Sequence, residues 1–483
     1  MAGQVNGPSR LTIALVAVIA VAPASAQGPP PSSAHPWHPP DEQQIANEAR
    51  RFRQPEFRID PTKTYSLPEL IDLAEAHNPE TRVTWENAIA QAAALGIARS
   101  ELYPTVSAVA LSGVDRSEAP LGSQFFRQTV PAFQVSLDLN YTIFDFGARR
   151  GRIDARSAQL LAANFAFNDF HRELIYTVEQ AYYRLLNTSS QETAARASLA
   201  NAQAVQQAAE ERLRNGLATL PDVLEARSAT AQSLYDLQAV LGAEQIARGD
   251  LATALGASAT STIRVQPLGE VPTPESVGES VNQAIDRAFD HRPDLQTLVA
   301  GIREATAQRK EAKAAFYPSL SLSASPSAQS LYVLQQNLPW GHTSDLTGGV
   351  ASSLNWTVFD GGQRKSRLAQ SEAQIRQAEA QVSAARDRIE DEVWTAYSNL
   401  DTAFRQREAA TALLDAATQS YAAALESYNY GVRNLLDVTA AQKVLAQARS
   451  ADILARTQVL ATLSDLAFRA ADSIQAGARN RRP

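Results

Sequence analysis

The chain has 483 residues, a formal net charge of −7, and 45% hydrophobic but only 7% aromatic residues. It contains no cysteine, which excludes disulfides, thiolate metal sites and a lipidated N-terminal cysteine. The mild acidity disfavours nucleic-acid binding, and the Ala-rich and Gln-rich stretches favour extended helices over a compact mixed core.

Residues 1–26 have the pattern of a secretory signal peptide. An apolar run follows Arg10 and ends shortly before small residues at positions 24–26, where cleavage is expected. No later stretch supplies the roughly 18 uninterrupted apolar residues of a membrane-spanning helix. The secreted chain is therefore expected to form a closed β-barrel, carry a lipid anchor or be soluble. Residues 27–64 are expected to be a proline-rich linker.

An internal repeat organises the rest of the sequence. Residues 65–266 form the first copy and residues 267–470 the second, followed by an expected flexible tail at residues 471–483. The offset is 214 at Tyr103 and Tyr317, and 215 at Gly147 and Gly362. One insertion or deletion across two long segments indicates that both halves share one fold.

Each copy is expected to begin with two helices. The first, at about residues 67–76 or 281–290, ends before a proline, because the residue preceding proline disfavours the helical conformation. The second helix begins at Pro79 or Pro293, since proline is well tolerated in a first helical turn. It is expected to end near Tyr103 or Tyr317.

Two strands are expected to follow in each copy, at about residues 104–114, 132–144, 318–327 and 348–359. Apolar and polar residues alternate there, which is typical of transmembrane barrel strands with one lipid-facing and one water-facing side. The alternative is a soluble hairpin with a half-buried face. The expected lipid-facing residues are Leu137, Leu139, Tyr141, Leu354 and Trp356.

A helix of unusual length is expected after each strand pair. Residues 152–215 and 363–430 contain neither glycine nor proline, and about 65 helical residues make a rod of roughly 100 Å. Apolar residues recur every seven positions from Ile375 to Ala403, which indicates coiled-coil packing. A returning helix of about 35 residues is expected after the turns at Gly216 and Gly431. Together with the helix after the first proline, it could pair along the whole rod.

Four strands cannot close a barrel, for which about eight are needed. An open sheet edge is not tolerated in lipid, so several copies of the chain are expected to share one barrel. Two copies would supply eight strands and three copies twelve, and composition does not decide between these numbers.

The strand-to-helix junctions at residues 140–147 and 355–362 read Asn-(Tyr/Trp)-Thr-(Ile/Val)-Phe-Asp-x-Gly. With the doubled plan and the turns LRNGLATLPDVLEAR and YNYGVRNLLDVTAAQ, they resemble the TolC family of outer-membrane efflux and secretion channel proteins over about residues 65–470. The resemblance implies an α+β membrane protein of the cell outer membrane with most of its mass in the periplasm. It implies a homotrimer with a 12-stranded β-barrel, continued by a periplasmic α-barrel of coiled-coil helices.

The resemblance also implies a function and partners. The chain would be the exit duct of a tripartite efflux pump or a type I secretion system, docking onto a periplasmic adaptor (membrane fusion) protein and an inner-membrane transporter. It would be no enzyme and need no cofactor or metal, and the sequence contains none of the common catalytic or phosphate-binding motifs. The transported substrate is not indicated.

The candidate functional residues lie at the two helix turns. Capping alone could explain them, with Gly216 and Gly431 as left-handed C-caps, Thr219 and Asn434 as N-caps, and the acids three residues later completing capping boxes. The resemblance adds roles. It places Asp222, Tyr428, Arg433 and Asp437 at a constricted periplasmic aperture, and the adaptor-docking turns at Gly216, Leu217, Ala218, Gly431, Val432 and Arg433. A further acidic position of the family is Ala440 here, which weakens the expected cation trapping.

Two other functions remain as alternatives. A periplasmic coiled-coil interaction protein without channel activity would use the same long helices but would not form a detergent-requiring oligomer. A passive porin would not need helices of about 65 residues.

Overall fold

The computed structural model describes residues 42–51, 57, 59–121, 124–267, 280–335 and 339–472. The expected signal peptide, most of the expected linker and nearly all of the expected tail lie outside these residues. The chain divides into two units, of which the first ends at Glu56 and the second begins at Phe57. The first unit contains helix α1 (Glu42–Arg51), within the region expected as a linker. Its sequence, EQQIANEARR, contains no proline or glycine, and its end charges suit the helix dipole.

The second unit contains the two copies of the repeat. Each begins with a short helix and a second helix, which are α2 (Leu67–His77) and α3 (Pro79–Ser100), then α6 (Val281–His291) and α7 (Pro293–Ala314). The prolines mark the starts of α3 and α7, as the sequence predicts. Asn78 caps α3 by accepting a hydrogen bond from Glu80 N at 2.9 Å.

The long helices are α4 (Ala148–Arg214) and α8 (Gln363–Asn429), each of 67 residues. They begin directly after Gly147 and Gly362, both in the left-handed region with φ of 93° and 89°. The seven-residue spacing is confirmed as a buried stripe on α8, which continues to Ala424. None of the helices in the described part of the chain combines the length and apolar character needed to cross a membrane.

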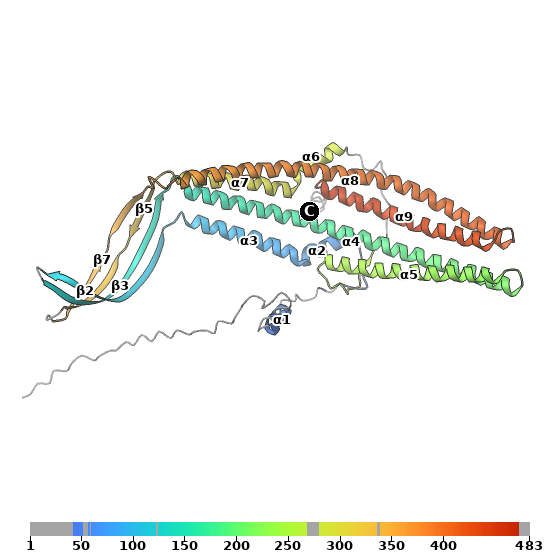
Figure 1. Cartoon of the computed structure of the whole chain (residues 1–483), viewed down its shortest axis with the longest axis horizontal. Helices are drawn as coiled ribbons and strands as arrows, with labels where there is room; N and C mark the ends of the chain where they lie inside the picture. The colour runs from blue at the N-terminus through green and yellow to red at the C-terminus, as the bar shows by residue number, and fades with distance from the viewer. Residues whose placement is uncertain are drawn as a thin grey trace, which may run out of the picture. The chain divides into compact units, whose positions relative to one another are not determined.

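The returning helices are α5 (Leu220–Ala254) and α9 (Leu435–Arg469), of 35 residues each. In Figure 1, α3 and α5 follow one another along α4, while α7 and α9 lie along α8. Asn78 Nδ2 donates to Ala254 O at 3.1 Å, which joins the start of α3 to the end of α5. The expected end-to-end pairing along the rods is therefore confirmed.

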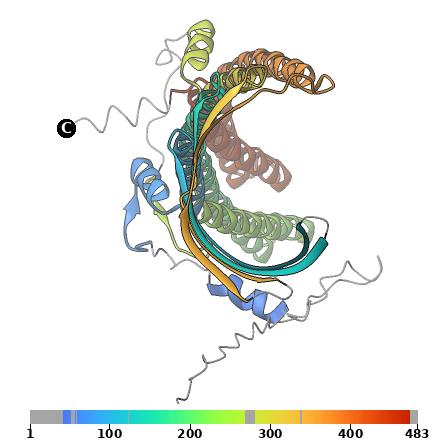
Figure 2. The same ribbon diagram turned by 90° about the vertical axis from the view of Figure 1, so that its left-hand side faces the viewer.

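The strands form one six-stranded antiparallel sheet at one end of the helices (Figure 1). Its members are β2 (Thr105–Leu121), β3 (Gln124–Phe144), β5 (Ser319–Ala324), β6 (Ser327–Gln335), β7 (Gly341–Thr347) and β8 (Val350–Asn355). Strand β3 pairs with β2 on one side and with both β5 and β6 on the other; β8 pairs with β5, and β7 with β6. Strands β5 and β6 follow one another along β3, and β8 and β7 follow one another beside them, so the six strands form four rows, called ribbons below. Figure 2 shows the ribbons bent into an arc.

Two of the four ribbons are interrupted at the same level. Pro326 separates β5 from β6, and Gly348 separates β7 from β8. A Cβ atom on Gly348 would lie 2.8 Å from Pro326 Cα, so the close approach of the two backbones requires glycine. The strand expected at 348–359 ends earlier, at Asn355. Trp356 lies one residue beyond it, and its indole Nε1 donates to Phe316 O at 3.2 Å.

The outer ribbons of the sheet each have a single neighbour among the described residues. Strand β2 pairs only with β3, while β7 and β8 pair only with β6 and β5. The sheet of one chain is therefore open at both edges.

A two-stranded parallel sheet lies beside the helices, formed by β1 (Thr64–Tyr65) and β4 (Arg264–Val265). It packs with α2, α4 and α5 in one core cluster, whose fully buried residues include Leu70, Val178 and Leu251. A second cluster joins α6, α7, α8 and α9, and a third lies where the helix turns of α4–α5 and α8–α9 meet.

Candidate functional site

The two helix turns lie at the end of the second unit opposite the sheet (Figure 1). Gly216 and Gly431 adopt the left-handed conformation with φ of 69° and 75°, as the sequence predicts. Leu217 N donates to Arg212 O at 2.7 Å and Val432 N to Ser427 O at 2.9 Å, so both turns satisfy the last helical carbonyls in the same way. Leu217 and Val432 are consequently held outward, 68% and 79% exposed.

The two turns differ in how the next helix is capped. The Asp222 carboxylate accepts hydrogen bonds from Thr219 N at 2.8 Å and Thr219 Oγ1 at 2.7 Å, which lowers the pKa of Asp222. At α9 only one half of this arrangement exists, because Asn434 Oδ1 accepts from Asp437 N at 3.0 Å. The predicted capping box is therefore confirmed at Asp222 and wrong at Asp437. The Thr219 hydroxyl donates to its acid, whereas Asn434 uses its side-chain oxygen as an acceptor.

Tyr428 is buried between the two turns rather than exposed on one of them. Only 5% of it is exposed, and it packs with residues of α4, α5 and α9 in the third core cluster. The Arg212 guanidinium lies 4.6 Å from its ring centre, and Arg212 Nη1 donates to Tyr428 O at 2.9 Å. Arg212 therefore joins the end of α4 to the turn between α8 and α9.

The Tyr428 hydroxyl is buried and has no hydrogen-bond partner among the described residues. Burial raises the pKa of this hydroxyl; the charge of Arg212 partly offsets the rise, and the charge of Asp222 adds to it. A buried hydroxyl without a partner is costly, and this one lies where the two helix turns meet.

Arg433 does not reach Tyr428 within the chain. It is exposed, as is Asp437, and its guanidinium makes no hydrogen bond or ion pair with the described residues. The position that contacts Tyr428 is instead Arg212, which sequence reasoning missed. The repeat does mark this place. Arg212-Leu213 in the first copy corresponds to Ser427-Tyr428 in the second, so the two copies differ at both residues of the contact.

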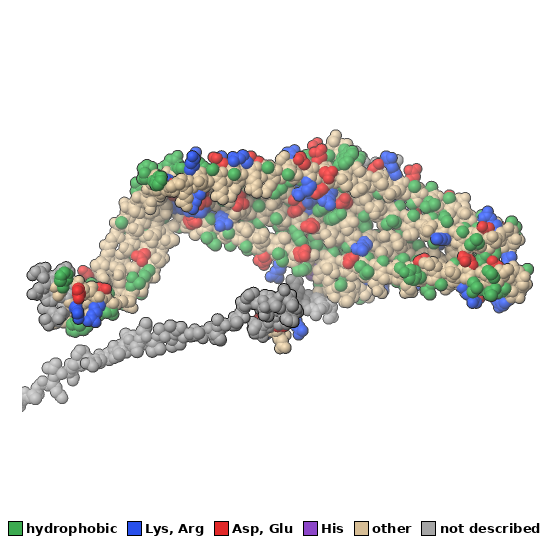
Figure 3. Space-filling model, in the orientation of Figure 1, with side chains coloured by type: hydrophobic (Ala, Val, Ile, Leu, Met, Phe, Trp, Pro, Cys, Tyr) green, Lys and Arg blue, Asp and Glu red, His purple; other side chains and the backbone are tan. Residues whose placement is uncertain are grey.

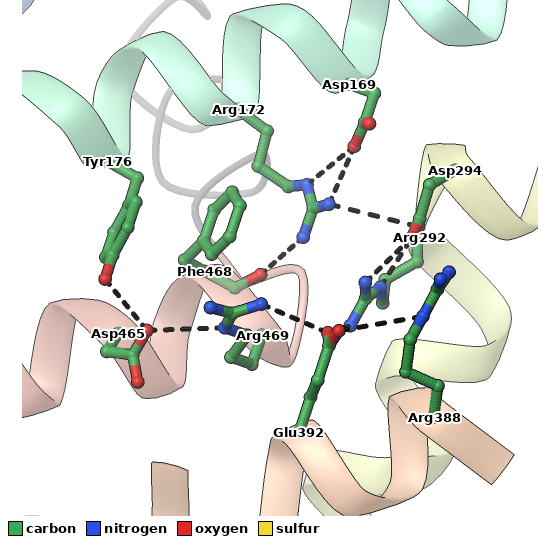
Figure 4. A network of polar contacts seen from close by, with 10 residues as sticks. All are labelled: Asp169, Arg172, Tyr176, Arg292, Asp294, Arg388, Glu392, Asp465, Phe468 and Arg469. Atoms are coloured by element: carbon green, nitrogen blue, oxygen red, sulfur yellow. Dashed lines mark hydrogen bonds and ion pairs between the residues drawn. The ribbon is translucent and has the colours of Figure 1, made fainter. Parts of the chain in front are cut away.

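A buried network of charged residues joins four helices midway along the second unit (Figure 4). Arg172 of α4 is 2% exposed; it contacts Asp169 at 2.7 Å and donates to Phe468 O at the end of α9. Arg292, before α7, is 3% exposed; it pairs with Asp294 at 2.7 Å and with Glu392 of α8 at 2.8 Å.

The network extends from Glu392 to the end of α9. Glu392 also contacts Arg469 at 3.2 Å, and Arg469 pairs with Asp465, which accepts a hydrogen bond from Tyr176. Burial acts to raise the pKa values of Asp294 and Glu392, but the hydrogen bonds and charge of Arg292 outweigh it, and both values lie below their ordinary range. The cations are thus fully paired, as buried charges must be.

Sequence reasoning missed this network, although the repeat again contained a signal. Arg292 occupies the position of Asn78 in the first copy, where the neutral amide bonds Ala254 O. The buried cation at this position is therefore found in the second copy and not in the first, and the network ties α7, α8 and α9 to α4.

The residues expected to face lipid lie at the sheet or directly beside it. Leu137 and Leu354 are 51% and 69% exposed, Leu139 and Tyr141 are half-buried, and Trp356 is 57% exposed just beyond β8. On the other face of β3, Ser136 is buried, and its hydroxyl donates to Asp138 at 3.1 Å. One face of β3 therefore carries apolar side chains, and the other carries polar ones, two of which are hydrogen-bonded to each other.

Comparison with known proteins adds an independent line of evidence. A model of the outer membrane efflux protein family matches residues 70–257 and 284–470, one match in each copy of the repeat. Protein CyaE of Bordetella pertussis is 29% identical over 315 residues, covering 64% of this chain and 63% of CyaE. Outer membrane protein OprJ of Pseudomonas aeruginosa is 26% identical over the same length, with the same coverage. Both alignments thus span slightly less than two thirds of the relative.

The fold is also found in solved structures. A membrane protein from Pseudomonas aeruginosa aligns with a TM-score of 0.74 and 25% identity, covering 87% of this chain and 99% of that one. The outer membrane protein VceC from Vibrio cholerae aligns with a TM-score of 0.71 and 18% identity, covering 84% and 95%. Sheet and helices therefore have the arrangement found in these two membrane proteins.

Proposed function

The chain belongs to the outer membrane efflux protein family, and on that premise we propose that three copies of it form an exit duct from the periplasm through the outer membrane. The sheets of the three chains close one β-barrel in the membrane, and the long helices form a tunnel beneath it. The same fold in outer-membrane relatives supports this placement.

The open sheet edges carry the proposal. One chain supplies four ribbons with a single neighbour at each outer ribbon among the described residues. In a bilayer every backbone polar group needs a partner, so β2 of one copy pairs with β7 and β8 of the next. Three copies then give twelve ribbons, enough for an open channel, whereas two give eight and a lumen filled by side chains.

The helix turns at the opposite end form the periplasmic entrance. Tyr428 and Arg212 lie between the two hairpins of each chain, and Asp222 adds negative charge beside them. Arg433 and Asp437 are exposed and available for contacts between copies. We assign these residues to an aperture that stays narrow at rest and favours cations.

The turns themselves are docking surfaces for a periplasmic adaptor protein, which in turn connects the duct to an inner-membrane transporter. Leu217 and Val432 project from them and offer two exposed apolar side chains to a partner at this end. Efflux of small molecules and secretion of polypeptides both fit this role.

A planar-bilayer recording tests the function. The mature protein, added from detergent, is expected to produce discrete conductance steps that persist after washing. A coiled-coil interaction protein of the periplasm would give no steps in the same experiment, and that result would overturn the proposal.

A further inference from the structure

Aromatic side chains gather where the sheet ends and the helices begin. Tyr103 and Tyr317 are 71% and 49% exposed, and Phe144 and Phe359 are 52% and 86% exposed. The repeat relates Tyr103 to Tyr317 and Phe144 to Phe359, so each copy contributes the same pair. We call these four residues the aromatic girdle. Figure 3 shows hydrophobic side chains gathered at this junction, next to the start of α8.

Four cations follow the aromatic girdle on the helix side. Arg99 and Lys313 occupy the last turns of α3 and α7, and Arg150 and Lys365 are the third residues of α4 and α8. They are again related in pairs by the repeat, and each lies four or six positions along the chain from a girdle residue. We call them the cation collar.

The collar residues are exposed and make no ion pair with the described residues. The carboxylates around them are already occupied. Residues 99–104, 139–154, 309–318 and 354–367 contain ten Lys or Arg and five Asp or Glu, a surplus of five positive charges (10 − 5). The five ion-paired carboxylates are Glu101, Asp145, Asp154, Glu311 and Asp360.

Helix stability does not explain the collar. A cation in a last helical turn suits the helix dipole, which could account for Arg99 and Lys313. Arg150 and Lys365, however, stand in the first turn of a helix, where positive charge is disfavoured, and neither helix has an acidic residue in that turn. Both copies of the repeat nevertheless keep a cation at this position.

We propose that the cation collar binds the phosphate headgroups of anionic glycerophospholipids in the membrane leaflet next to the helices. Exposed aromatic rings mark the boundary of a bilayer, and long cationic side chains beside them reach the phosphates. The pairs recur in both copies of the repeat, and three chains would place twelve cations around the duct. That arrangement suits a continuous lipid surface better than one docked protein.

The inference rests on the proposed function, since it needs the sheet to lie in a bilayer. Trp356 lies at the same junction and reports on the lipid beside it. The full mature protein would be reconstituted in phosphatidylethanolamine bilayers containing graded amounts of phosphatidylglycerol. Quenching of Trp356 by dibrominated phosphatidylglycerol and by dibrominated phosphatidylethanolamine is then compared. A background in which Trp37, Trp85, Trp340 and Trp394 are replaced by phenylalanine leaves Trp356 as the one tryptophan of the chain.

Each cation near an anionic bilayer surface strengthens association roughly fivefold. The parent should therefore prefer phosphatidylglycerol by about fivefold or more, and high salt should weaken this preference. Replacing Arg99, Arg150, Lys313 and Lys365 together by glutamine should bring it close to equality. The matched control removes the same charge elsewhere, through Arg184→Gln, Arg214→Gln, Arg405→Gln and Lys443→Gln, and should keep the preference.

The possible failures are distinguishable. Efficient quenching by both lipids without preference in the parent, or a preference unchanged in the collar variant, would overturn the inference and leave the sheet in the bilayer. No quenching of Trp356 by either lipid would instead contradict the proposed function.

Discussion

Arg212→Met tests whether the contact between Arg212 and Tyr428 holds the entrance closed. The change removes the guanidinium but keeps an unbranched apolar stem. A hydrogen bond from a charged donor contributes about 1.5–3 kcal/mol, and a cation–π contact about 0.5–2 kcal/mol. Because Arg212 is half-buried, the lower ends of both ranges apply, which gives about 2 kcal/mol per chain. Each chain then shifts the ratio of closed to open states by roughly thirtyfold.

Single-channel recording in planar bilayers measures this shift. Arg212→Met should raise the conductance or the open probability. Arg214→Met is the matched comparison, since it removes a nearby exposed cation whose ion pair is with Glu211 of the same helix. Conductance equal to the parent in Arg212→Met, or a larger increase in Arg214→Met, would refute the assignment of Arg212 as the closing residue.

Three further predictions concern the architecture. Leu137→Arg should reduce the yield of detergent-extracted oligomer, because a charge facing lipid costs about 2–4 kcal/mol. Asn140→Arg, on the opposite face of β3, should leave that yield unchanged. Equal yields of the two variants would show that the faces are misassigned. Arg292→Asn should lower the free energy of unfolding by about 1.5–3 kcal/mol, since it removes the buried cation that bonds two half-buried carboxylates, of which Glu392 keeps its contact with Arg469. Because the pKa values of those carboxylates are lowered in the folded state, their contribution is present above about pH 4 and lost as pH falls further. Thermal unfolding in acid should therefore affect the parent more than the variant, and parallel pH curves would contradict this. Gly151→Ala should destabilise the fold, because the added Cβ would lie 2.8 Å from Glu311 N. Gly301→Ala, where nothing lies near the added Cβ, should stabilise the fold by about 0.5–1 kcal/mol in the same measurement. The opposite order of stabilities would refute the close approach of α4 and α7.

Apart from α1, which falls in the expected linker, the helices could be predicted from the sequence to within a few residues. Pro79 and Pro293 begin helices, because proline fixes φ at a helical value. Gly147 and Gly362 precede the long helices, because glycine readily adopts the left-handed conformation found there. The repeat then doubled the evidence for each boundary.

The breaks in the sheet could not be predicted in the same way. They depend on Pro326 lying opposite Gly348, a contact fixed by the register of two strands rather than by either sequence alone. The alternation of apolar and polar residues predicts the strands, but it does not predict where a strand is interrupted.

Those features of the candidate site that depend on a few neighbouring residues were predicted from the sequence. The left-handed glycines and the box at Thr219 follow from spacing along one turn. The contact between Arg212 and Tyr428 joins residues 216 positions apart, and the Arg172 network joins four helices, so neither follows from spacing. Both coincide with positions at which the two copies of the repeat differ.

Disulfide cross-linking of the sheet edges tests the central claim most directly. The chain has no cysteine of its own, so one cysteine introduced on β2 and one on β8 supply the only thiols of the protein. Pairs are scanned along both edges in intact outer membranes and separated without reductant. We predict a covalent species of three chains as the largest product, which reductant returns to single chains. Products of one chain only at every pair, or a ladder continuing beyond three chains, would contradict a closed barrel shared by three copies.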